Sequence, residues 1–313
     1  LDLTQVEAIA DIVNAETEIQ RKQAISHLSG DFFKSSRKIF EDLKKVLANV
    51  EAIIDFSEED LPENLMNEIL EQNKNIISSI NSMLSGAKTS VSIRTGFLVT
   101  ILGKPNTGKS SFINLISDKD IAIVTKKPGT TRDLIESYVD IDGYPIRFVD
   151  TAGIRESTDP IEKIGVKKAL KVSKEANINL VFIKNHKDIS SFNNIKNSIF
   201  VKSKQDISKR SFKDRGFYNI SSKNKYGIDD LLGIIKNMIS KEMPTENIHI
   251  SRERHIKCLK DIIKHLENSK KEKTLDLLAE DIRMASKSFN MLFGNVDIED
   301  ILDIVFSDFC IGK

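Results

Sequence analysis

The chain has 313 residues, a length that favours two domains, and its 47 Lys and Arg residues nearly balance 46 Asp and Glu residues. This balance excludes a general electrostatic attraction to nucleic acid, although it does not exclude a local basic patch. Only two cysteines, Cys258 and Cys310, are present, which excludes a disulfide scaffold and favours a reducing compartment. Because no apolar run reaches the length of a membrane span and no signal peptide opens the chain, we expect a cytoplasmic protein with no membrane partner.

Residues 1–95 are predicted to be helical. Ser85-Gly86-Ala87 predicts a helix stop. The chain begins at Leu1 inside a helical pattern, so we expect it to be a fragment of a longer polypeptide. Apolar residues repeat at helical spacing from Leu3 to Val13, from Ile39 to Ile54 and from Leu65 to Leu84.

From residue 96 to residue 242 the pattern changes to short apolar runs separated by helical segments. Asp142-Gly143 lies between two such runs and predicts a hairpin. Strands that alternate with helices predict an α/β sheet with parallel strands. The expected strands are 97–102, 137–141, 146–149, 178–183, 198–201 and 217–220.

Residues 243–313 return to helical spacing, with one stripe from Ile256 to Leu266 and another from Leu275 to Met284. Neither helical part is expected to fold alone. We therefore predict one all-α helical bundle, formed by residues 1–95 and 243–313, that is interrupted by an inserted α/β domain at 96–242.

The run from Gly103 to Ser110 fits the P-loop pattern of Gly, four residues and Gly-Lys-Ser, between a predicted strand and a predicted helix. The loop backbone and the helix N-terminus are expected to bind the β-phosphate. Lys109 is expected to reach the β- and γ-phosphates, and the hydroxyl of Ser110 to bind Mg²⁺. The nucleotide contacts predicted here are Asn106, Thr107, Gly108, Lys109, Ser110 and Ser111.

Two later loops have the character of nucleotide-dependent switches. Asp150-Thr151-Ala152-Gly153 ends a predicted strand, where the carboxylate can hold Mg²⁺ through water and Gly153 lets a backbone N–H approach the γ-phosphate. Gly129-Thr130-Thr131 lies in a polar loop upstream, where a threonine hydroxyl, assigned to Thr131, can complete the Mg²⁺ shell. Both loops are therefore expected to be two-state elements.

Ser203-Lys204-Gln205-Asp206 follows a predicted strand and is the expected base-reading element. The Asp206 carboxylate can accept hydrogen bonds from guanine N1–H and from its 2-amino group, and the stem of Lys204 can cover the base. Ser203 stands where GTPases usually have Asn, so the element is expected to hold the base more weakly. A charged, solvated loop is the alternative that stays open.

Asn185-His186-Lys187-Asp188 is a rival match to the base-reading pattern. We reject it because Ser221-Ser222-Lys223, a version of the Ser-Ala-Lys loop of GTPases, follows a strand at a suitable distance after Asp206 and not after Asp188. Ser222 and Lys223 are therefore predicted to contact the nucleotide.

Together these motifs resemble the MnmE (TrmE) family of bacterial tRNA-modification GTPases. The resemblance implies a Ras-like P-loop GTPase domain, or G domain, inserted into the helical bundle. It also implies that the family's N-terminal folate-binding, dimer-forming domain is missing. The residues that carry it are the P-loop with Asn106, Gly129 to Asp133, Asp150 to Glu156, the end Phe309-Cys310-Ile311-Gly312-Lys313 and the opening Leu1 to Ala8.

The resemblance supplies a catalytic scheme. Ile154 stands where many GTPases have a water-orienting Gln, so another group must position the water. In the family a Glu does so, and Glu162 matches it, although from the residues alone Glu162 is an ordinary exposed helix residue. The family uses K⁺ where others use an arginine finger, held by the match of Asn106 and by backbone oxygens.

The loop that matches the family's K⁺ loop also implies pairing of two G domains face to face in a homodimer. The K⁺ ligands implied there are Thr125, Lys127 and Thr130, and the implied GTP contacts are Thr125, Lys126, Lys127, Pro128, Gly129 and Thr130. Lys126-Lys127-Pro128 is less neutral than the family's sequence, but backbone ligation tolerates that change.

Cys310 and Lys313 match family residues near the site of a 5-formyltetrahydrofolate-type folate. The resemblance makes Cys310 necessary for tRNA modification, whereas its flanking phenylalanines favour an ordinary buried thiol. The implied function is a K⁺-dependent GTPase that works with the flavoprotein MnmG (GidA) on aminomethyl-type modification of the wobble uridine of tRNA. The alternatives are a ribosome-assembly GTPase and a non-catalytic nucleotide-binding scaffold.

Overall fold

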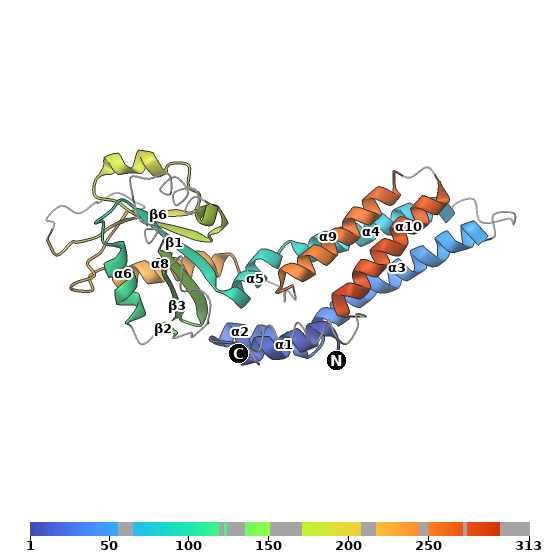
Figure 1. The fold of residues 1–313 in the computed structure, drawn as a ribbon, viewed down its shortest axis with the longest axis horizontal. Coiled ribbons are helices and arrows are strands. Elements are labelled where there is room, and N and C mark those ends of the chain that lie inside the picture. Colours follow the sequence, from blue (N-terminus) through green and yellow to red (C-terminus); the bar gives the residue numbers. More distant parts are fainter. Residues whose placement is uncertain are drawn as a thin grey trace. The chain divides into compact units, whose positions relative to one another are not determined.

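The computed structural model of the chain describes residues 1–55, 65–118, 122–123, 135–150, 171–207, 217–243, 250–271 and 274–294. Its contacts divide the chain into two compact units. One comprises residues 1–15, 20–94 and 244–313, and the other comprises residues 16–19 and 95–243. The first is helical and the second is α/β, which confirms an α/β domain inserted into an all-α bundle (Figure 1).

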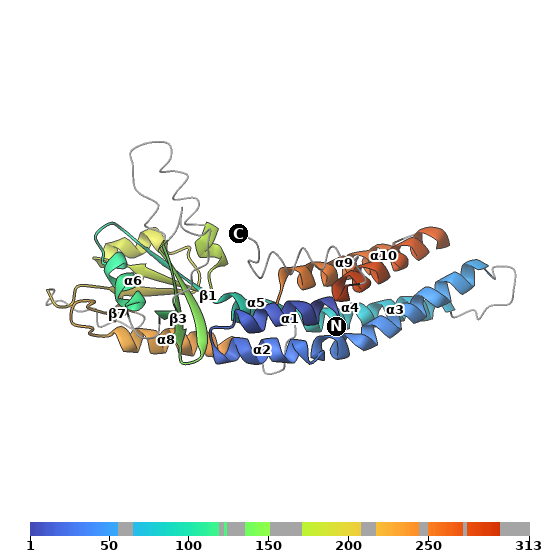
Figure 2. The same ribbon diagram turned by 60° about the horizontal axis from the view of Figure 1, so that its bottom comes forward.

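The centre of the helical unit is a bundle in which α3, α4, α9 and α10 each pack against two of the others (Figures 1 and 2). Within the described residues, no helix combines the length and the apolar character that a membrane crossing needs. The helices of this unit are α1 (Leu3–Val13), α2 (Glu18–Leu28), α3 (Asp31–Asp55), α4 (Leu65–Leu84), α5 (Ala87–Thr95), α9 (Glu253–Ser269) and α10 (Leu275–Phe293).

One apolar core joins the helices that precede the inserted unit to those that follow it. Val46 of α3 and Ile76 of α4 belong to the same buried cluster as Leu259 of α9 and Phe289 of α10. Each helix contributes residues three or four positions apart, so every apolar stripe faces the others. Burying such stripes is the main favourable contribution to folding, and here neither half of the helical sequence can do so alone.

The first helix buries a different face from the one that its apolar spacing suggests. Leu3 and Ala10 are buried, but Ile9 and Val13 are exposed. Glu7 is only 3% exposed. A buried carboxylate needs charged or hydrogen-bonding partners, so α1 is held by polar contacts as well as by apolar packing.

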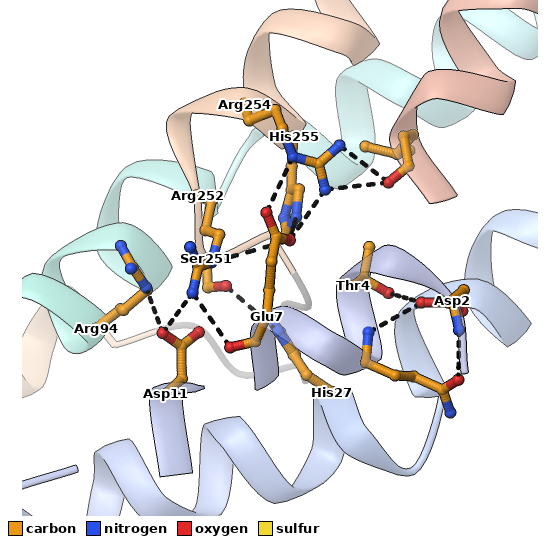
Figure 3. Close-up of polar contacts among 12 residues, drawn as sticks. Asp2, Thr4, Glu7, Asp11, His27, Arg94, Ser251, Arg252, Arg254 and His255 are labelled. Atoms are coloured by element: carbon orange, nitrogen blue, oxygen red, sulfur yellow. Dashed lines mark hydrogen bonds and ion pairs between the residues drawn. The ribbon is translucent and has the colours of Figure 1, made fainter. Parts of the chain in front are cut away.

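Those partners come from the start of α9, as Figure 3 shows. The guanidinium group of Arg254 lies 2.9 Å from Glu7 Oε2, and His255 Nε2 lies 2.9 Å from the same oxygen. Asp11 Oδ1, one helical turn further along α1, accepts hydrogen bonds from Arg94 Nε of α5 and from the Arg252 guanidinium group, each at 2.8 Å. The network therefore ties α1 to the segments on both sides of the insertion.

The described strands of the second unit form one sheet in the order β2-β3-β4-β1-β5-β6-β7. Pairing is parallel from β4 through β1, β5 and β6 to β7, and β3 pairs antiparallel with both β2 and β4. The strands are β1 (Phe97–Gly103), β2 (Ala122–Ile123), β3 (Ile135–Ile141), β4 (Tyr144–Asp150), β5 (Ile178–Phe182), β6 (Ser198–Lys202) and β7 (Phe217–Asn219).

The expected hairpin and parallel sheet are confirmed. Asp142 and Gly143 have φ angles of 50° and 89°, as a tight two-residue hairpin turn requires. Helix α6 (Lys109–Ser117) follows β1 and buries Phe112 against Phe148 of β4 and Phe182 of β5. The unit also contains the 3₁₀ helix η2 (His186–Phe192) and α8 (Ile228–Lys241).

Candidate nucleotide-binding site

Loops predicted to bind the nucleotide leave the sheet at the carboxyl ends of parallel strands. The P-loop follows β1, Asp150 is the last residue of the neighbouring β4, residues 203–206 follow β6, and residues 221–223 lie just beyond β7. Open α/β sheets bind ligands at this edge. The sheet topology therefore gathers motifs that are far apart in the sequence.

The P-loop has the backbone that its glycines make possible. Gly103 and Gly108 have φ angles of 137° and 95°, and Asn106 between them has a φ angle of 58°. A Cβ atom at Gly103 would overlap the carbonyl oxygen of Phe182 on β5. Because Gly108 also caps the N-terminus of α6, the loop leads directly into the positive end of that helix.

Lys109 is buried, and its ammonium group is held inside the loop. Its Nζ donates to the carbonyl oxygens of Gly103 and Lys104, each at 2.7 Å. The Thr107 hydroxyl donates to the same Lys104 oxygen at 2.7 Å. The Lys104 carbonyl oxygen therefore holds the side chains of two predicted nucleotide contacts, Lys109 and Thr107.

Hydrogen bonds join the base-reading loops to each other and to the P-loop. The Ser203 hydroxyl donates to the carbonyl oxygen of Thr107. The Ser221 hydroxyl donates to Asp206 Oδ1 at 2.7 Å, and the Gln205 backbone N–H donates to the Ile220 carbonyl at 3.1 Å. Ser203 thus keeps a link to the phosphate-binding loop.

Ser221 is a functional candidate that the sequence analysis missed, although it is the first residue of the Ser221-Ser222-Lys223 match. Ser221 is fully buried, and its hydroxyl orients the carboxylate of Asp206. Asp206 itself is exposed. The signal was present in the motif, but the sequence pattern does not say which of two adjacent serines turns inward.

The rival Asn185-His186-Lys187-Asp188 motif has a different use. Asp188 is buried at the first turn of η2, where its Oδ2 accepts the backbone N–H groups of Lys184 and Asn185, each at 3.1 Å. Its Oδ1 lies 2.6 Å from Lys104 Nζ. The hydrogen bond from the Lys104 ammonium group outweighs burial and lowers the pKa of Asp188. Asp188 therefore caps a helix beside the P-loop, which supports Asp206 as the base-reading carboxylate.

The residues predicted to hold Mg²⁺ are partly described. Asp150 is buried and lies opposite Ile101 of β1 in the strand register, while Ser110 is exposed at the start of α6. A carboxylate and a hydroxyl are the oxygen ligands that Mg²⁺ prefers, so this donor set fits the ion. Thr131, the third predicted residue, lies outside the described part of the chain.

The remaining predictions divide between exposed residues and residues outside the description. The exposed or half-buried ones, all near the carboxyl edge of the sheet, are Asn106, Ser111, Lys204, Ser222 and Lys223. Those outside the described residues are Thr125, Lys126, Lys127, Pro128, Gly129, Thr130, Thr151, Ala152, Gly153, Glu162, Cys310 and Lys313.

The family model described as the MnmE helical domain matches residues 3–310. The chain belongs to the MnmE family. One curated relative is the tRNA modification GTPase MnmE of Rickettsia prowazekii (strain Madrid E), which is 38% identical over 325 residues covering 100% of this chain and 73% of the relative. MnmE of Pelagibacter ubique (strain HTCC1062) is 40% identical over 326 residues, with the same two coverages.

Membership of the MnmE family makes the chain a P-loop GTPase of the tRNA-modification class. Among solved structures, Era in complex with MgGDPNP and nucleotides 1506-1542 of 16S ribosomal RNA is 25% identical. The match covers 48% of this chain and 57% of the Era chain with a TM-score of 0.37, so the overall similarity is low. The MnmE assignment comes from the sequence matches alone.

Proposed function

We propose that this GTPase is K⁺-dependent and that it drives, together with a flavoprotein partner, aminomethyl-type modification of the wobble uridine of tRNA. Its relatives carry the name tRNA modification GTPase, which supports tRNA as the object of the reaction. A cytoplasmic location follows from that role. The same matches disfavour a ribosome-assembly GTPase.

The observation that carries the nucleotide part of the proposal is the hydrogen bonding between loops. Ser203 joins the base-reading loop to the P-loop at Thr107, and Ser221 aims the Asp206 carboxylate. Pre-positioned donors and acceptors reduce the cost of ordering the site when a ligand binds. This arrangement favours a guanine nucleotide site over a scaffold that has lost its base specificity.

Within this site, Lys109 would bind the β- and γ-phosphates, and the N-terminus of α6 would face the β-phosphate. Ser110, Asp150 and Thr131 would hold Mg²⁺, which when bound supplies positive charge against the phosphates. Glu162 is our candidate for positioning the attacking water. Glu162→Ala should slow hydrolysis while GTP affinity stays near normal, because a residue that acts only in the transition state lowers kcat.

Asn106 is the described residue of the proposed K⁺ site. It is exposed on the P-loop, so its side chain is accessible to a ligand beside the phosphates. Thr125, Lys127 and Thr130 would supply backbone oxygens. We propose that the same loop pairs two G domains across a homodimer.

The modification chemistry itself is assigned to folate and to the flavoprotein MnmG (GidA). Cys310 and Lys313 are proposed to lie near the folate site. We further propose that residues 96–242 form the G domain, and that residues 1–95 and 243–313 form the helical domain that carries its conformational changes to the modifying partner.

The test is GTP turnover by the full chain in matched KCl and NaCl buffers over a range of protein concentrations. We expect faster turnover in KCl that rises with concentration, and loss of that difference in Asn106→Ala. Asn237→Ala, an exposed change on α8, is the matched control and should behave as wild type. Equal rates in both salts would overturn the cation mechanism and leave the GTPase assignment in place.

A further inference from the structure

The ion pair between Lys104 and Asp188 is a polar contact at the nucleotide edge that the proposed function leaves unused. It joins the second position of the P-loop to the first turn of η2 with an Nζ to Oδ1 distance of 2.6 Å. These residues are 84 positions apart. Neither belongs to the predicted nucleotide contacts.

The carboxylate end of this pair is rigidly held. The Asp188 side chain is 9% exposed, and its second oxygen accepts two backbone N–H groups at the start of η2. The helix η2 follows β5, which pairs with β1 in the register that places Phe182 opposite Gly103. Asp188 therefore offers a fixed negative charge immediately beside the P-loop.

The lysine end leads directly to the nucleotide-binding groups. The Lys104 carbonyl oxygen accepts the Lys109 ammonium group and the Thr107 hydroxyl, each at 2.7 Å. Fixing the Lys104 side chain restricts the peptide unit that carries this oxygen. An exposed ion pair alone contributes little, but here the pair constrains a loop whose geometry decides whether Lys109 reaches the phosphates.

We propose that Asp188 is a positioning residue for GTP, which acts through Lys104 on the orientation of the P-loop. The inference rests on the GTPase activity of the chain and not on K⁺, folate or a partner protein. Because Lys109 contacts the phosphates before and during the reaction, losing the pair should weaken GTP binding more than it slows the chemical step.

The test compares Asp188→Asn, Lys104→Met, the double variant and Lys104→Arg in the full chain, measuring KM and kcat for GTP and the Kd for GDP. Asn at 188 keeps one oxygen for the η2 N–H groups, but it loses the charge and places an NH2 group where the other oxygen accepted from Lys104. We expect kcat/KM to fall about 5- to 20-fold in Asp188→Asn and in Lys104→Met, mostly through KM. The double variant should be no worse than either of these two, and Lys104→Arg, which keeps the positive charge, should retain most of the wild-type kcat/KM.

A matched control removes a second ion pair of the same unit. Lys236 Nζ lies 2.6 Å from Asp142 Oδ2, and Asp142 occupies a turn position that Asn tolerates. Asp142→Asn should leave KM and kcat unchanged. Unchanged KM in Asp188→Asn, additive losses in the double variant, or an equal loss in Asp142→Asn would each overturn the positioning role. The GTPase assignment would fail separately, if the wild-type chain did not turn over GTP.

Discussion

The two units use polar side chains to join distant segments in opposite ways. In the helical unit, a buried carboxylate is paired inside the protein, where Glu7 Oε2 contacts the Arg254 guanidinium group and the His255 ring (Figure 3). In the α/β unit, the serine hydroxyls of Ser203 and Ser221 join the base-reading loops to the P-loop and to each other, beside the Lys104–Asp188 ion pair. In the helical unit the Glu7 charge is paired within the fold, whereas in the α/β unit Asp206 stays exposed for a ligand.

Mutations in the two units should therefore affect different properties of the protein. Removing one member of a buried ion network leaves the other charges without a partner, so the cost falls on stability. Removing a hydroxyl at the nucleotide edge costs one hydrogen bond, so the cost falls mainly on ligand binding. Variants in the two regions should therefore separate stability from affinity.

The largest effect is expected for Glu7→Ala. The change leaves Arg254 and His255 facing a cavity without their carboxylate, and the free energy of unfolding of the helical unit should fall by about 3–5 kcal/mol. Urea unfolding followed by the helical circular dichroism signal measures it.

Glu51→Ala is the control, because the Glu51–Arg283 pair also joins two helices but is far more exposed. It should cost less than about 1 kcal/mol. Equal losses in the two variants would show that burial does not distinguish the networks.

A pH titration sharpens the same contrast. Burial alone raises the pKa of Glu7, but the hydrogen bonds from His255 and Arg254 outweigh it and hold that pKa at about 2, below its ordinary value of 4.5. A lowered carboxyl pKa contributes stability that is present above pH 4.5 and is lost as the pH falls toward 2. The loss should approach about 3 kcal/mol.

Titration of His255 should also lower the stability of the protein as the pH falls. Burial lowers its pKa, and the hydrogen bond to Glu7 offsets only part of that effect. Within the described residues its Nδ1 has no hydrogen-bond partner, which fits a neutral ring that donates from Nε2 to Glu7. Stability should therefore begin to fall below pH 6.5, the ordinary pKa of His. A urea midpoint that does not change between pH 7 and pH 3 would contradict the network's assigned charges.

The smallest effect is expected for Ser203→Ala. It removes the hydroxyl that donates to the Thr107 carbonyl and leaves the backbone unchanged. GTP affinity should fall about 2- to 10-fold, with the free energy of unfolding changed by less than about 1.5 kcal/mol. Nucleotide titration and urea unfolding of the same variant separate the two. A stability loss without an affinity loss would place Ser203 with the structural residues.

Local patterns predicted most of the fold and the position of the site. The P-loop, the Asp142-Gly143 turn and the parallel strands depend on residues close together in the sequence, where backbone preferences and apolar spacing act. The interrupted bundle was also predictable, because neither apolar helical half could bury its stripes alone. The structure confirms it through a core that joins α3 to α9 and α10.

The polar contacts between distant segments were not predictable. Glu7 meets Arg254 across 247 positions, and no spacing rule connects them. Apolar spacing therefore misjudged α1, where Ile9 and Val13 are exposed and Glu7 is buried. Similarly, the Asn185–Asp188 match could be rejected as a base-reading motif from the sequence. The ion pair of Asp188 with Lys104 could not be predicted, because it depends on the register of β1 and β5.

Asp206, oriented by Ser221, is proposed to read guanine at the carboxyl edge of the sheet. The most direct measurement is the affinity of the wild-type chain, Asp206→Asn and Asp188→Asn for GTP and for XTP. Xanthine has an oxygen where guanine has its 2-amino group, so an Asn amide should favour it. We predict that wild type prefers GTP, that Asp206→Asn prefers XTP, and that Asp188→Asn keeps the wild-type preference. An unchanged preference in Asp206→Asn, or a reversal in Asp188→Asn, would contradict the account.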